Sequence, residues 1–413
     1  MHAFSLGRSL GLVDNTRRRR HANPEEVEVK SRLFRMAMAG SALALVLSTA
    51  DAQAGLTVIH SFTGADGAVP YGGVTPAPHG GLYVATLAGG SANGGALTLI
   101  DKDGTSRVLH SFTGGSDGQS PFGTPFRWSL DGNLYGTTEN GGASDCGTIY
   151  RYLPRSGVYQ QLYAFGCAPD GDAPVAAFAD VGGGVLESTA FEGGTSDVGA
   201  LIFVRSDGSA GTSCSFSGND GDYPDASITP ANGNFYTTVH MDDIGYGTIT
   251  EFHGFTCSTS VIHRFASGND GAFPSGRLLF YNNALYGTTD FGGGPNLGTV
   301  FRVSLNGGNY AVLHTFQGIC CGNGDGSFPE SGLTLNPGDN MLYGTTTNGG
   351  NSSDLGTVFK IDPSTGAEAI VHSFSGADGA NPTGDLYIRK GKIYGTTQNG
   401  GANNAGVVFK LKT

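Results

Sequence analysis

Residues 341–376 read MLYGTTTNGGNSSDLGTVFKIDPSTGAEAIVHSFSG, and this stretch decides the fold. It contains, in order, a Leu-Tyr-Gly-Thr-Thr run, a Gly-Gly pair, a Gly-Thr-Val-Phe-Lys run and a Val-His-Ser-Phe run. The same order of pieces recurs seven times along the chain. Self-similarity with a period of about 50 residues indicates a ring or stack of equivalent supersecondary units.

Two markers define the period. The first is a Phe preceded two residues earlier by His or a stand-in for it, at Phe62, Phe112, Phe165, Phe216, Phe265, Phe316 and Phe374. The second is Asp-Gly-x-x-Pro, which ends at Pro70, Pro121, Pro174, Pro224, Pro274, Pro329 and Pro382. Leu-Tyr-Gly-Thr-Thr is intact at Leu134, Leu285 and Leu342 and altered in the other repeats.

Each repeat holds four short runs rich in Val, Ile, Thr, Tyr and Phe, separated by Gly, Asn, Asp or Pro. In the sixth repeat these runs are 331–335, 341–346, 356–361 and 369–374. Short β-rich runs with turn residues between them predict strands joined by tight turns. A four-stranded unit of this length is typical of a propeller blade. We therefore predict an all-β fold, a seven-bladed β-propeller of four-stranded antiparallel blades.

The two ends of the repeat region complement each other. The region opens at residues 56–62 with the run that comes fourth in each unit and closes at 406–411 with the run that comes third. We expect the N-terminal strand to complete the last blade, because this pairing removes exposed sheet edges. The predicted propeller spans residues 55–413, after an N-terminal extension and signal peptide in residues 1–54.

A secretory signal is predicted at residues 30–54. Lys30, Arg32 and Arg35 precede a short apolar run, 36–47, and Ala52-Gln53-Ala54 supplies a cleavage site of small residues. The apolar run is short for a transmembrane span, although a membrane-anchored N-terminus remains the alternative. We expect an exported protein, periplasmic, cell-surface or extracellular, without a stable membrane span after cleavage.

The composition fits an acidic, loop-rich propeller. The formal net charge is −12, and the chain contains 70 Gly and 17 Pro. Once residues 1–54, which include Arg17–Arg20, are removed, no basic stripe remains, which argues against a nucleic-acid partner. We expect a monomer whose partner is a glycan or an envelope protein.

Six cysteines allow three disulfides in an exported chain. Cys146 lies in a loop between the second and third strands of blade 2, and Cys167 follows the fourth strand of the same blade. Because these two classes of loop open on one face of a propeller, we predict a Cys146–Cys167 bridge. The pairing of Cys214, Cys257, Cys320 and Cys321 stays open.

Three repeated features invite a functional interpretation and a structural one. The seven Asp residues of Asp-Gly-x-x-Pro could bind cations, but a turn in which Asp accepts from a backbone N–H two residues later is favoured. Pro would then begin the innermost strand. The His before each marker Phe is predicted to be structural, since each lies in a different outer strand. The central Gly of Leu-Tyr-Gly-Thr-Thr would make room for a marker Phe.

These motifs together resemble those of the bacterial GloVer tandem repeats. The pieces that carry the resemblance are Tyr-Gly-Thr-Thr, Gly-Gly, Gly-Thr-Val-Phe-Lys and His-Ser-Phe, clearest in the second, fifth, sixth and seventh repeats. The resemblance implies an exported, propeller-like protein and supplies no established activity.

In a ring of near-copies, the repeat that departs most is the best candidate for a site. In the fourth repeat, His240, Asp242 and Asp243 replace the Gly-Gly loop, and Glu192 lies in the neighbouring third repeat. A His with carboxylates could hold Ca²⁺ or another divalent ion, or perform acid–base work. Drift of an exposed loop is the favoured interpretation, so we expect no cofactor, with Ca²⁺ as the possible exception. Trp128, the single Trp, could stack on a sugar or pack in the core.

The sequence shows no catalytic motif of the Gly-x-Ser-x-Gly or His-Glu-x-x-His type, so catalytic residues remain unassigned. We predict a non-enzymatic binding or scaffold propeller of the cell envelope or extracellular space. The alternative is a polysaccharide lyase or glycoside hydrolase with acidic residues on one loop face. Convergence of several acids or a His would favour the enzyme, and a shallow Gly-, Ser- and Asn-lined face the scaffold.

Overall fold

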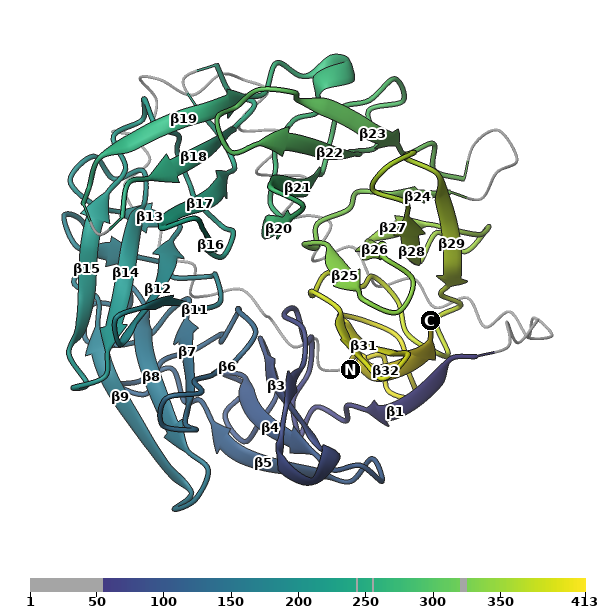
Figure 1. Cartoon of the computed structure of the whole chain (residues 1–413). Helices are drawn as coiled ribbons and strands as arrows, with labels where there is room; N and C mark the ends of the chain where they lie inside the picture. Colours follow the sequence, from purple (N-terminus) through teal and green to yellow (C-terminus); the bar gives the residue numbers. More distant parts are fainter. Residues whose placement is uncertain (1–54, 243, 255, 320–324) are drawn as a thin grey trace, which may run out of the picture. The chain divides into compact units, whose positions relative to one another are not determined.

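The computed structural model describes residues 55–413 except 243, 255 and 320–324, so the proposed signal peptide lies outside the described residues. Seven four-stranded antiparallel sheets form the blades of a β-propeller, as predicted (Figure 1). Within the described part of the chain, no helix is long and apolar enough to cross a membrane.

The strands of each blade run from the axis outward. Blade 1 contains β2 (Thr75–Pro76), β3 (Leu82–Thr86), β4 (Ala96–Ile100) and β5 (Ser106–Ser111). Blade 2 contains β6 (Phe126–Arg127), β7 (Leu134–Thr138), β8 (Thr148–Leu153) and β9 (Val158–Ala164). Blade 3 contains β11 (Ala179–Gly182), β12 (Val185–Ala190), β14 (Ala200–Arg205) and β15 (Ala210–Ser215). Blade 4 contains β16 (Thr229–Ala231), β17 (Asn234–Val239), β18 (Thr248–Phe252) and β19 (Thr259–Arg264).

The remaining blades follow the same order. Blade 5 contains β20 (Leu279–Tyr281), β21 (Ala284–Thr289), β22 (Thr299–Ser304) and β23 (Ala311–Thr315). Blade 6 contains β25 (Thr334–Asn336), β26 (Met341–Thr346), β28 (Thr357–Ile361) and β29 (Glu368–Ser373). Blade 7 contains β30 (Tyr387–Arg389), β31 (Lys392–Thr397), β32 (Val407–Lys412) and β1 (Thr57–Ser61). Short pairs β10 (Gly171–Asp172) with β13 (Glu192–Gly193) and β24 (Gly326–Ser327) with β27 (Asn348–Gly349), and 3-10 turns η2 (Pro78–Gly80) and η3 (Gly268–Asp270), complete the elements.

The ring closes between its two ends. β1 pairs antiparallel with β32, from Thr57 opposite Lys410 to Ser61 opposite Val407. This confirms that the last blade is assembled from both ends of the repeat region. The marker residue Phe62, which follows β1, is fully buried and joins Val408 in one core cluster, so the closing strand contributes core packing as well as hydrogen bonds.

The central Gly of Leu-Tyr-Gly-Thr-Thr makes room for an aromatic ring of its own blade. A Cβ on Gly136 would lie 2.4 Å from the Tyr150 hydroxyl oxygen, and Gly136 and Tyr150 are cross-strand partners. Gly344 meets Phe359 in the same way, with 2.7 Å between the added Cβ and the ring. The expectation that a marker Phe fills this space is therefore wrong, because the third strand's aromatic reaches it first.

The repeated Pro packs against the preceding blade. A Cβ added to Gly298 would lie 2.4 Å from Pro329 Cδ, and one added to Gly406 would lie 2.5 Å from Pro70 Cδ across the ring closure. Gly298 also has φ +98°, a conformation that L side chains rarely adopt. The expectation that Pro begins the inner strand is wrong: β25 begins at Thr334, five residues after Pro329. Pro instead fills the contact between neighbouring blades.

The Asp of Asp-Gly-x-x-Pro ties its turn to the His before the marker Phe. Asp66 accepts from the Thr63 backbone N–H at 2.8 Å, and its other oxygen lies 2.7 Å from His60 Nε2. The Asp carboxylate thus accepts from the backbone N–H three residues earlier and not from the one two residues later, which corrects the predicted geometry. Equivalent His–Asp pairs occur at His110–Asp117, His263–Asp270, His314–Asp325 and His372–Asp378. The favoured structural interpretation of the turn agrees with these contacts.

Candidate functional site

Two positions of each repeat come together at the inner rim of the propeller. The first follows the repeated Pro, and its residues are Tyr71, Phe122, Val175, Asp225, Ser275, Glu330 and Thr383. The second follows β3 and its equivalents, and its residues are Leu87, Glu139, Phe191, His240, Asp290, Thr347 and Gln398. Both positions vary in chemistry from blade to blade, whereas the residues around them repeat.

Backbone contacts hold these two positions beside each other. The N–H of His240 donates to Tyr223 O at 3.3 Å, and the N–H of Asp290 donates to Phe273 O at 3.1 Å. Neighbouring blades also touch at this rim: a Cβ on Gly72 would lie 2.6 Å from Thr124 N. Side chains from several blades therefore meet within a small volume.

Five of these side chains form what we call the axial cluster: Tyr71, Asp225, His240, Asp290 and Glu330. The Tyr71 hydroxyl donates to Glu330 Oε2 at 3.0 Å, which links blades 1 and 6. Nδ1 of His240 lies 3.3 Å from Asp225 Oδ2. Asp290 and His240 are only 3% and 5% exposed. The cluster thus gathers three carboxyl groups, an imidazole and a phenol.

The environment of the axial cluster favours the uncharged form of its carboxyl groups. Burial, and then the charges of Glu330 and Asp225, raise the pKa of Asp290 well above its usual value, although the Ser275 hydroxyl donates to it at 2.5 Å. Burial also raises the pKa values of Glu330 and Asp225. Perturbed carboxyl groups in close proximity are the usual components of acid–base and ligand-binding sites.

Another part of the rim carries aromatic side chains, although the carboxyl group of Glu139 belongs to the rim as well. The Tyr71 ring packs on Phe122 with 4.1 Å between ring centroids, and Phe191 packs on Tyr223 at 5.2 Å. Tyr71 therefore belongs to both halves, because its ring contacts an aromatic side chain and its hydroxyl binds a carboxylate. An acidic half beside an aromatic half can contact both the hydroxyl groups and the C–H faces of an amphipathic ligand.

Of the residues singled out in the sequence, only His240 belongs to the axial cluster. Within the described residues, the charge of Glu192 acts on Glu139, and Glu192 pairs in register with Asp172 on β10. Asp243 lies outside the described residues. The convergence of His240 with Glu192 stays a prediction: the described contacts place His240 beside Asp225, and Glu192 near Glu139 and Asp172.

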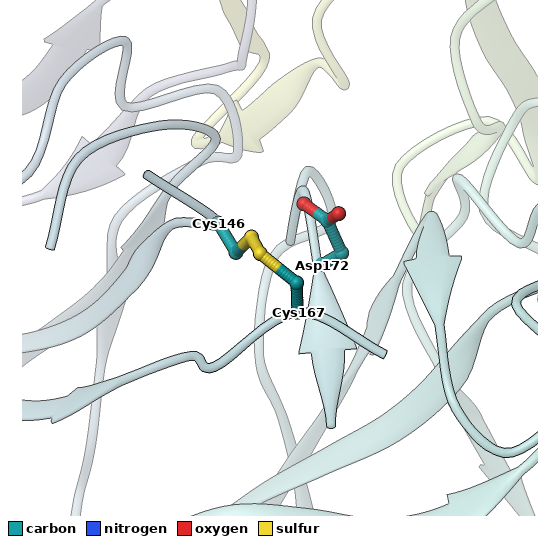
Figure 2. A group of neighbouring side chains, drawn as sticks. All are labelled: Cys146, Cys167 and Asp172. Carbon is teal, nitrogen blue, oxygen red and sulfur yellow. A yellow bond between two sulfur atoms is a disulfide. The ribbon is translucent and has the colours of Figure 1, made fainter. Parts of the chain in front are cut away.

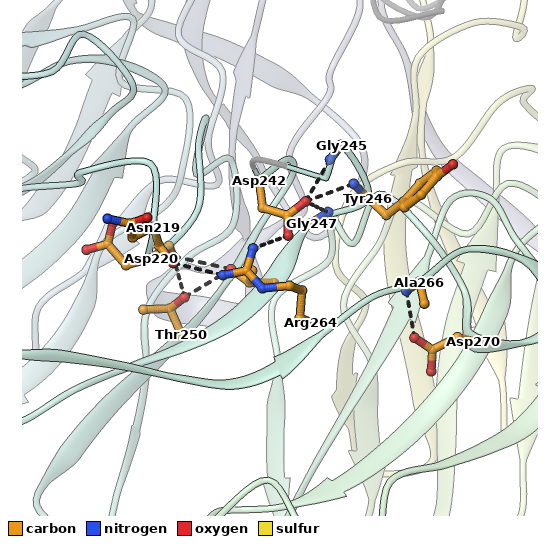
Figure 3. A network of polar contacts seen from close by, with 11 residues as sticks. Asn219, Asp220, Asp242, Gly245, Tyr246, Gly247, Thr250, Arg264, Ala266 and Asp270 are labelled. Atoms are coloured by element: carbon orange, nitrogen blue, oxygen red, sulfur yellow. Dashed lines mark hydrogen bonds and ion pairs between the residues drawn. The ribbon is translucent and has the colours of Figure 1, made fainter. Parts of the chain in front are cut away.

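Asp242 organises its own loop. One carboxylate oxygen accepts from the backbone N–H groups of Gly245 at 2.8 Å and Tyr246 at 3.0 Å, and the other binds Arg264 (Figure 3). In blade 2 the equivalent loop is capped by Asp145, which accepts from the Gly141 N–H at 2.8 Å. Asp242 therefore replaces a repeated loop cap.

We expect Asp242→Asn to lower stability and to leave ligand binding by the folded protein intact. The substitution removes the charge that pairs with Arg264, at a cost of about 1–2 kcal/mol in the free energy of unfolding. Urea unfolding measures this effect, with substitution of the exposed Asp101 by Asn as the control. Unchanged stability together with lost glycan binding would instead place a ligand site on this loop.

Trp128 is 1% exposed, so it packs in the core and does not present a face to a sugar. Its indole N–H donates to Asp180 at 3.0 Å, across to blade 3. Core packing was one of the two interpretations of this residue, and the burial supports it.

The predicted Cys146–Cys167 bridge is present, and Asp172 lies beside it (Figure 2). Because both sulfurs are bonded to each other, this group of three cannot supply thiolate ligands to a metal. A second bridge joins Cys214 of β15 to Cys257, which lies between β18 and β19, and so links blades 3 and 4. Bridges of this kind suggest an oxidising compartment and hence an exported protein.

The axial carboxyl groups Asp225, Asp290 and Glu330 were missed in the sequence. Each is a single residue beside a motif that is repeated from blade to blade, so no motif of its own marks it as functional. Writing the repeats one below another and comparing only the residue after Pro and the residue after Thr-Thr would have found them.

Comparison with solved structures supports the propeller fold. The extracellular domain described as that of a one-component system from B. thetaiotaomicron matches with a TM-score of 0.55 at 13% identity, covering 86% of this chain and 40% of that one. An oligogalacturonate lyase in complex with manganese matches with a TM-score of 0.55 at 11% identity, covering 90% and 96%. A puromycin-hydrolysing peptidase from Mycobacterium tuberculosis matches with a TM-score of 0.54 at 13% identity, covering 85% and 52%.

The chain thus spans less than half the length of the first of these structures. At these identities the likeness concerns the fold alone. No curated protein matches the sequence. A sequence model described as the Gloeobacter/Verrucomicrobia repeat matches residues 40–250 and 183–409, which confirms the resemblance seen in the motifs. The chain belongs to the Gloeobacter/Verrucomicrobia repeat family.

Proposed function

We propose that the protein is an exported binding propeller that takes a glycan, or another polyhydroxylated ligand, at the axial cluster. One observation carries the proposal: the propeller concentrates Asp225, Asp290 and Glu330 at its inner rim although their burial opposes ionisation. Carboxyl groups that repel one another destabilise a fold, so an arrangement of this kind is expected where a ligand uses it.

The chemistry of the rim fits a sugar. Carboxyl groups accept hydrogen bonds from hydroxyl groups when ionised and donate one when protonated. Tyr71 and Phe122 offer apolar ring edges and faces on the other side of the same rim. The two disulfides support export, the condition under which extracellular glycans would be met.

The test is a glycan array probed with the purified mature chain, with and without Ca²⁺. We expect saturable binding that falls at least about tenfold in Glu330→Gln, since the variant loses the carboxylate that accepts from Tyr71. Asp207→Asn, on an exposed loop, is the matched control. Equal binding by Glu330→Gln and wild type would contradict the axial location, and no binding by wild type would favour a protein partner.

A glycoside hydrolase or lyase is the second candidate. It is favoured by the convergence of Asp225, Asp290 and Glu330, because carboxyl groups with raised pKa values can act as general acids near neutral pH. Incubating any glycan found on the array with the protein and analysing the products by mass spectrometry distinguishes the two. Smaller products released by the wild-type chain would establish an enzyme, and recovery of the intact glycan would favour the binding propeller.

A further inference from the structure

One of the repeated His–Asp pairs differs from the others in its third member. The outer-strand residue four positions before each His, or its stand-in, is Leu56, Ser106, Tyr159, Ala210, Thr259, Tyr310 or Glu368. Glu368 is the only acid in this series. It lies on β29 of blade 6, close to His314 and Asp325.

In the other blades the third residue is neutral, and in several of them it contacts the pair. Ser106 Oγ donates to Asp66 Oδ2 at 2.7 Å, and the Tyr310 ring stacks on His263 with 3.8 Å between centroids. The hydroxyl of Thr63 also donates to Asp66, at 2.8 Å. The first turn therefore contains one carboxylate surrounded by donors, as a structural role requires.

The blade 6 site has Gln317 and Glu368 where the first turn has the hydroxyl residues Thr63 and Ser106, so it gains a second carboxyl group. The backbone N–H groups of Gln317 and Gly326 donate to Asp325, at 3.1 and 2.6 Å. His314 Nε2 lies 3.1 Å from Asp325 Oδ2. Asp325 is 5% exposed, and Oε1 of Glu368 is buried and has no hydrogen-bond partner among the described residues. A buried carboxylate oxygen that accepts no hydrogen bond is stabilised when it binds a cation or a proton.

The donor atoms are close enough to share one ion. One ligand atom from each of His314, Asp325 and Glu368 lies within 4.8 Å of the other two. One imidazole nitrogen and two carboxylate oxygens are typical ligands of divalent transition metals, and a water molecule commonly completes such a three-residue set. Ca²⁺ prefers six or more oxygen ligands, which makes this donor set a poorer match for it.

The geometry points to His314, Asp325 and Glu368 as a binding site for a divalent transition-metal ion such as Zn²⁺ or Mn²⁺. The ion would neutralise two neighbouring carboxylates and tie the turn after β23 to the outer strand of the next blade. This site is separate from the axial cluster and does not depend on the proposed function.

The experiment is a calorimetric titration of EDTA-treated, desalted protein with ZnCl₂ and, separately, with MnCl₂. We expect saturable binding of one ion at this site and a rise in the melting temperature with the better ion. Glu368→Ser should weaken this binding by about 100-fold or more, since loss of an outer-shell partner alone costs 10- to 100-fold. The variant should still fold, because it recreates the His60–Asp66–Ser106 arrangement of blade 1.

Tyr310→Ser is the matched control, with the same position changed in the neighbouring blade. It should leave metal affinity unchanged. Glu330→Gln tests the axial carboxyl groups: if it removes the metal while Glu368→Ser does not, the ion belongs to the axial cluster and the inference is overturned. Absence of saturable binding of both metals to the wild-type chain also overturns it.

Discussion

Glu187→Tyr is expected to stabilise the protein by about 3 kcal/mol or more at pH 8, chiefly by removing a buried carboxylate. Glu187 occupies the Tyr position of Leu-Tyr-Gly-Thr-Thr and is 5% exposed, and its Oε2 is buried with no hydrogen-bond partner among the described residues. Burial raises its pKa to about 7, although Arg205 acts in the opposite direction. At the equivalent positions of blades 2 and 6, Tyr135 and Tyr343 are 1% and 0% exposed.

The missing ring leaves a pocket of about 250 Å³ between blades 3 and 4. Glu187, Phe203 and Arg205 line it, and the Arg205 guanidinium lies 4.0 Å from the centre of the Phe203 ring. A tyrosine at position 187 would occupy part of this space, and the additional apolar burial would contribute roughly 1–2 kcal/mol. The substitution therefore combines an electrostatic gain with a packing gain.

The electrostatic part has a defined pH dependence. The folded-state pKa of Glu187 lies above the value of 4.5 usual for Glu, so its effect is absent at low pH. As pH rises from about 4.5 to 7, the unfolded chain loses this proton while the folded chain keeps it, and wild-type stability falls by about 3 kcal/mol from this group. The stability difference between Glu187→Tyr and wild type should grow over that range and then level off.

Glu187→Gln separates the two contributions, because it removes the charge and leaves the pocket. Urea unfolding of wild type and both variants at pH 4.5, 6 and 8 provides the measurement. Glu187→Gln should match wild type at pH 4.5 and exceed it at pH 8, whereas Glu187→Tyr should exceed Glu187→Gln by a constant amount. A difference between Glu187→Gln and wild type that does not vary with pH would show that Glu187 is ionised in the fold.

The repetition explains why so much of the architecture could be predicted. A residue needed seven times for the same reason, such as the Gly at 298 or the Pro at 329, leaves a pattern that one sequence suffices to reveal. The pairing of β1 with β32 followed from counting strands at both ends. The Cys146–Cys167 bridge followed from knowing which loops share a face. Each of these conclusions depends on topology, which the pattern of repeats contains.

Contacts between repeats were harder to predict for the same reason. The space above Gly136 could belong to any nearby aromatic, and only the strand register shows that it belongs to Tyr150. The axial cluster depends on which blades face one another across the inner rim, as in the bond between Tyr71 and Glu330, 259 residues apart. His240 was found because its whole loop departs from the pattern. Asp290 was missed because it changes a single residue beside an intact Thr-Thr pair.

Asp290→Asn is expected to raise stability and to abolish ligand binding at the axial cluster. The free energy of unfolding should increase by about 1–2 kcal/mol at pH 8, because the variant removes a carboxyl group whose ionisation is opposed by burial and by Glu330 and Asp225. Its folded-state pKa is raised, so the stability gain should shrink as pH falls toward the usual range of Asp. The amide retains an acceptor for the Ser275 hydroxyl.

The same substitution at Asp378 is the control, and it should have the opposite effect. Burial alone would raise the pKa of Asp378, but hydrogen bonds from His372 and Ser375 lower it below its usual value. A carboxylate with a lowered pKa stabilises the fold above its unfolded pKa, and that contribution is lost as pH falls through the folded value. Asp378→Asn should therefore destabilise the protein at pH 7, and ligand binding by the folded fraction should persist.

Urea unfolding and ligand affinity, measured on the same preparations, show whether a carboxylate belongs to a ligand-binding site or to a structural turn. A carboxylate with a structural role stabilises the fold, so its removal lowers the free energy of unfolding, as expected for Asp378. A carboxylate kept for a ligand lowers stability and is retained only because binding requires it, as expected for Asp290. If Asp290→Asn destabilises the chain as much as Asp378→Asn does, Asp290 is part of the scaffold and the axial cluster loses its strongest support as a binding site.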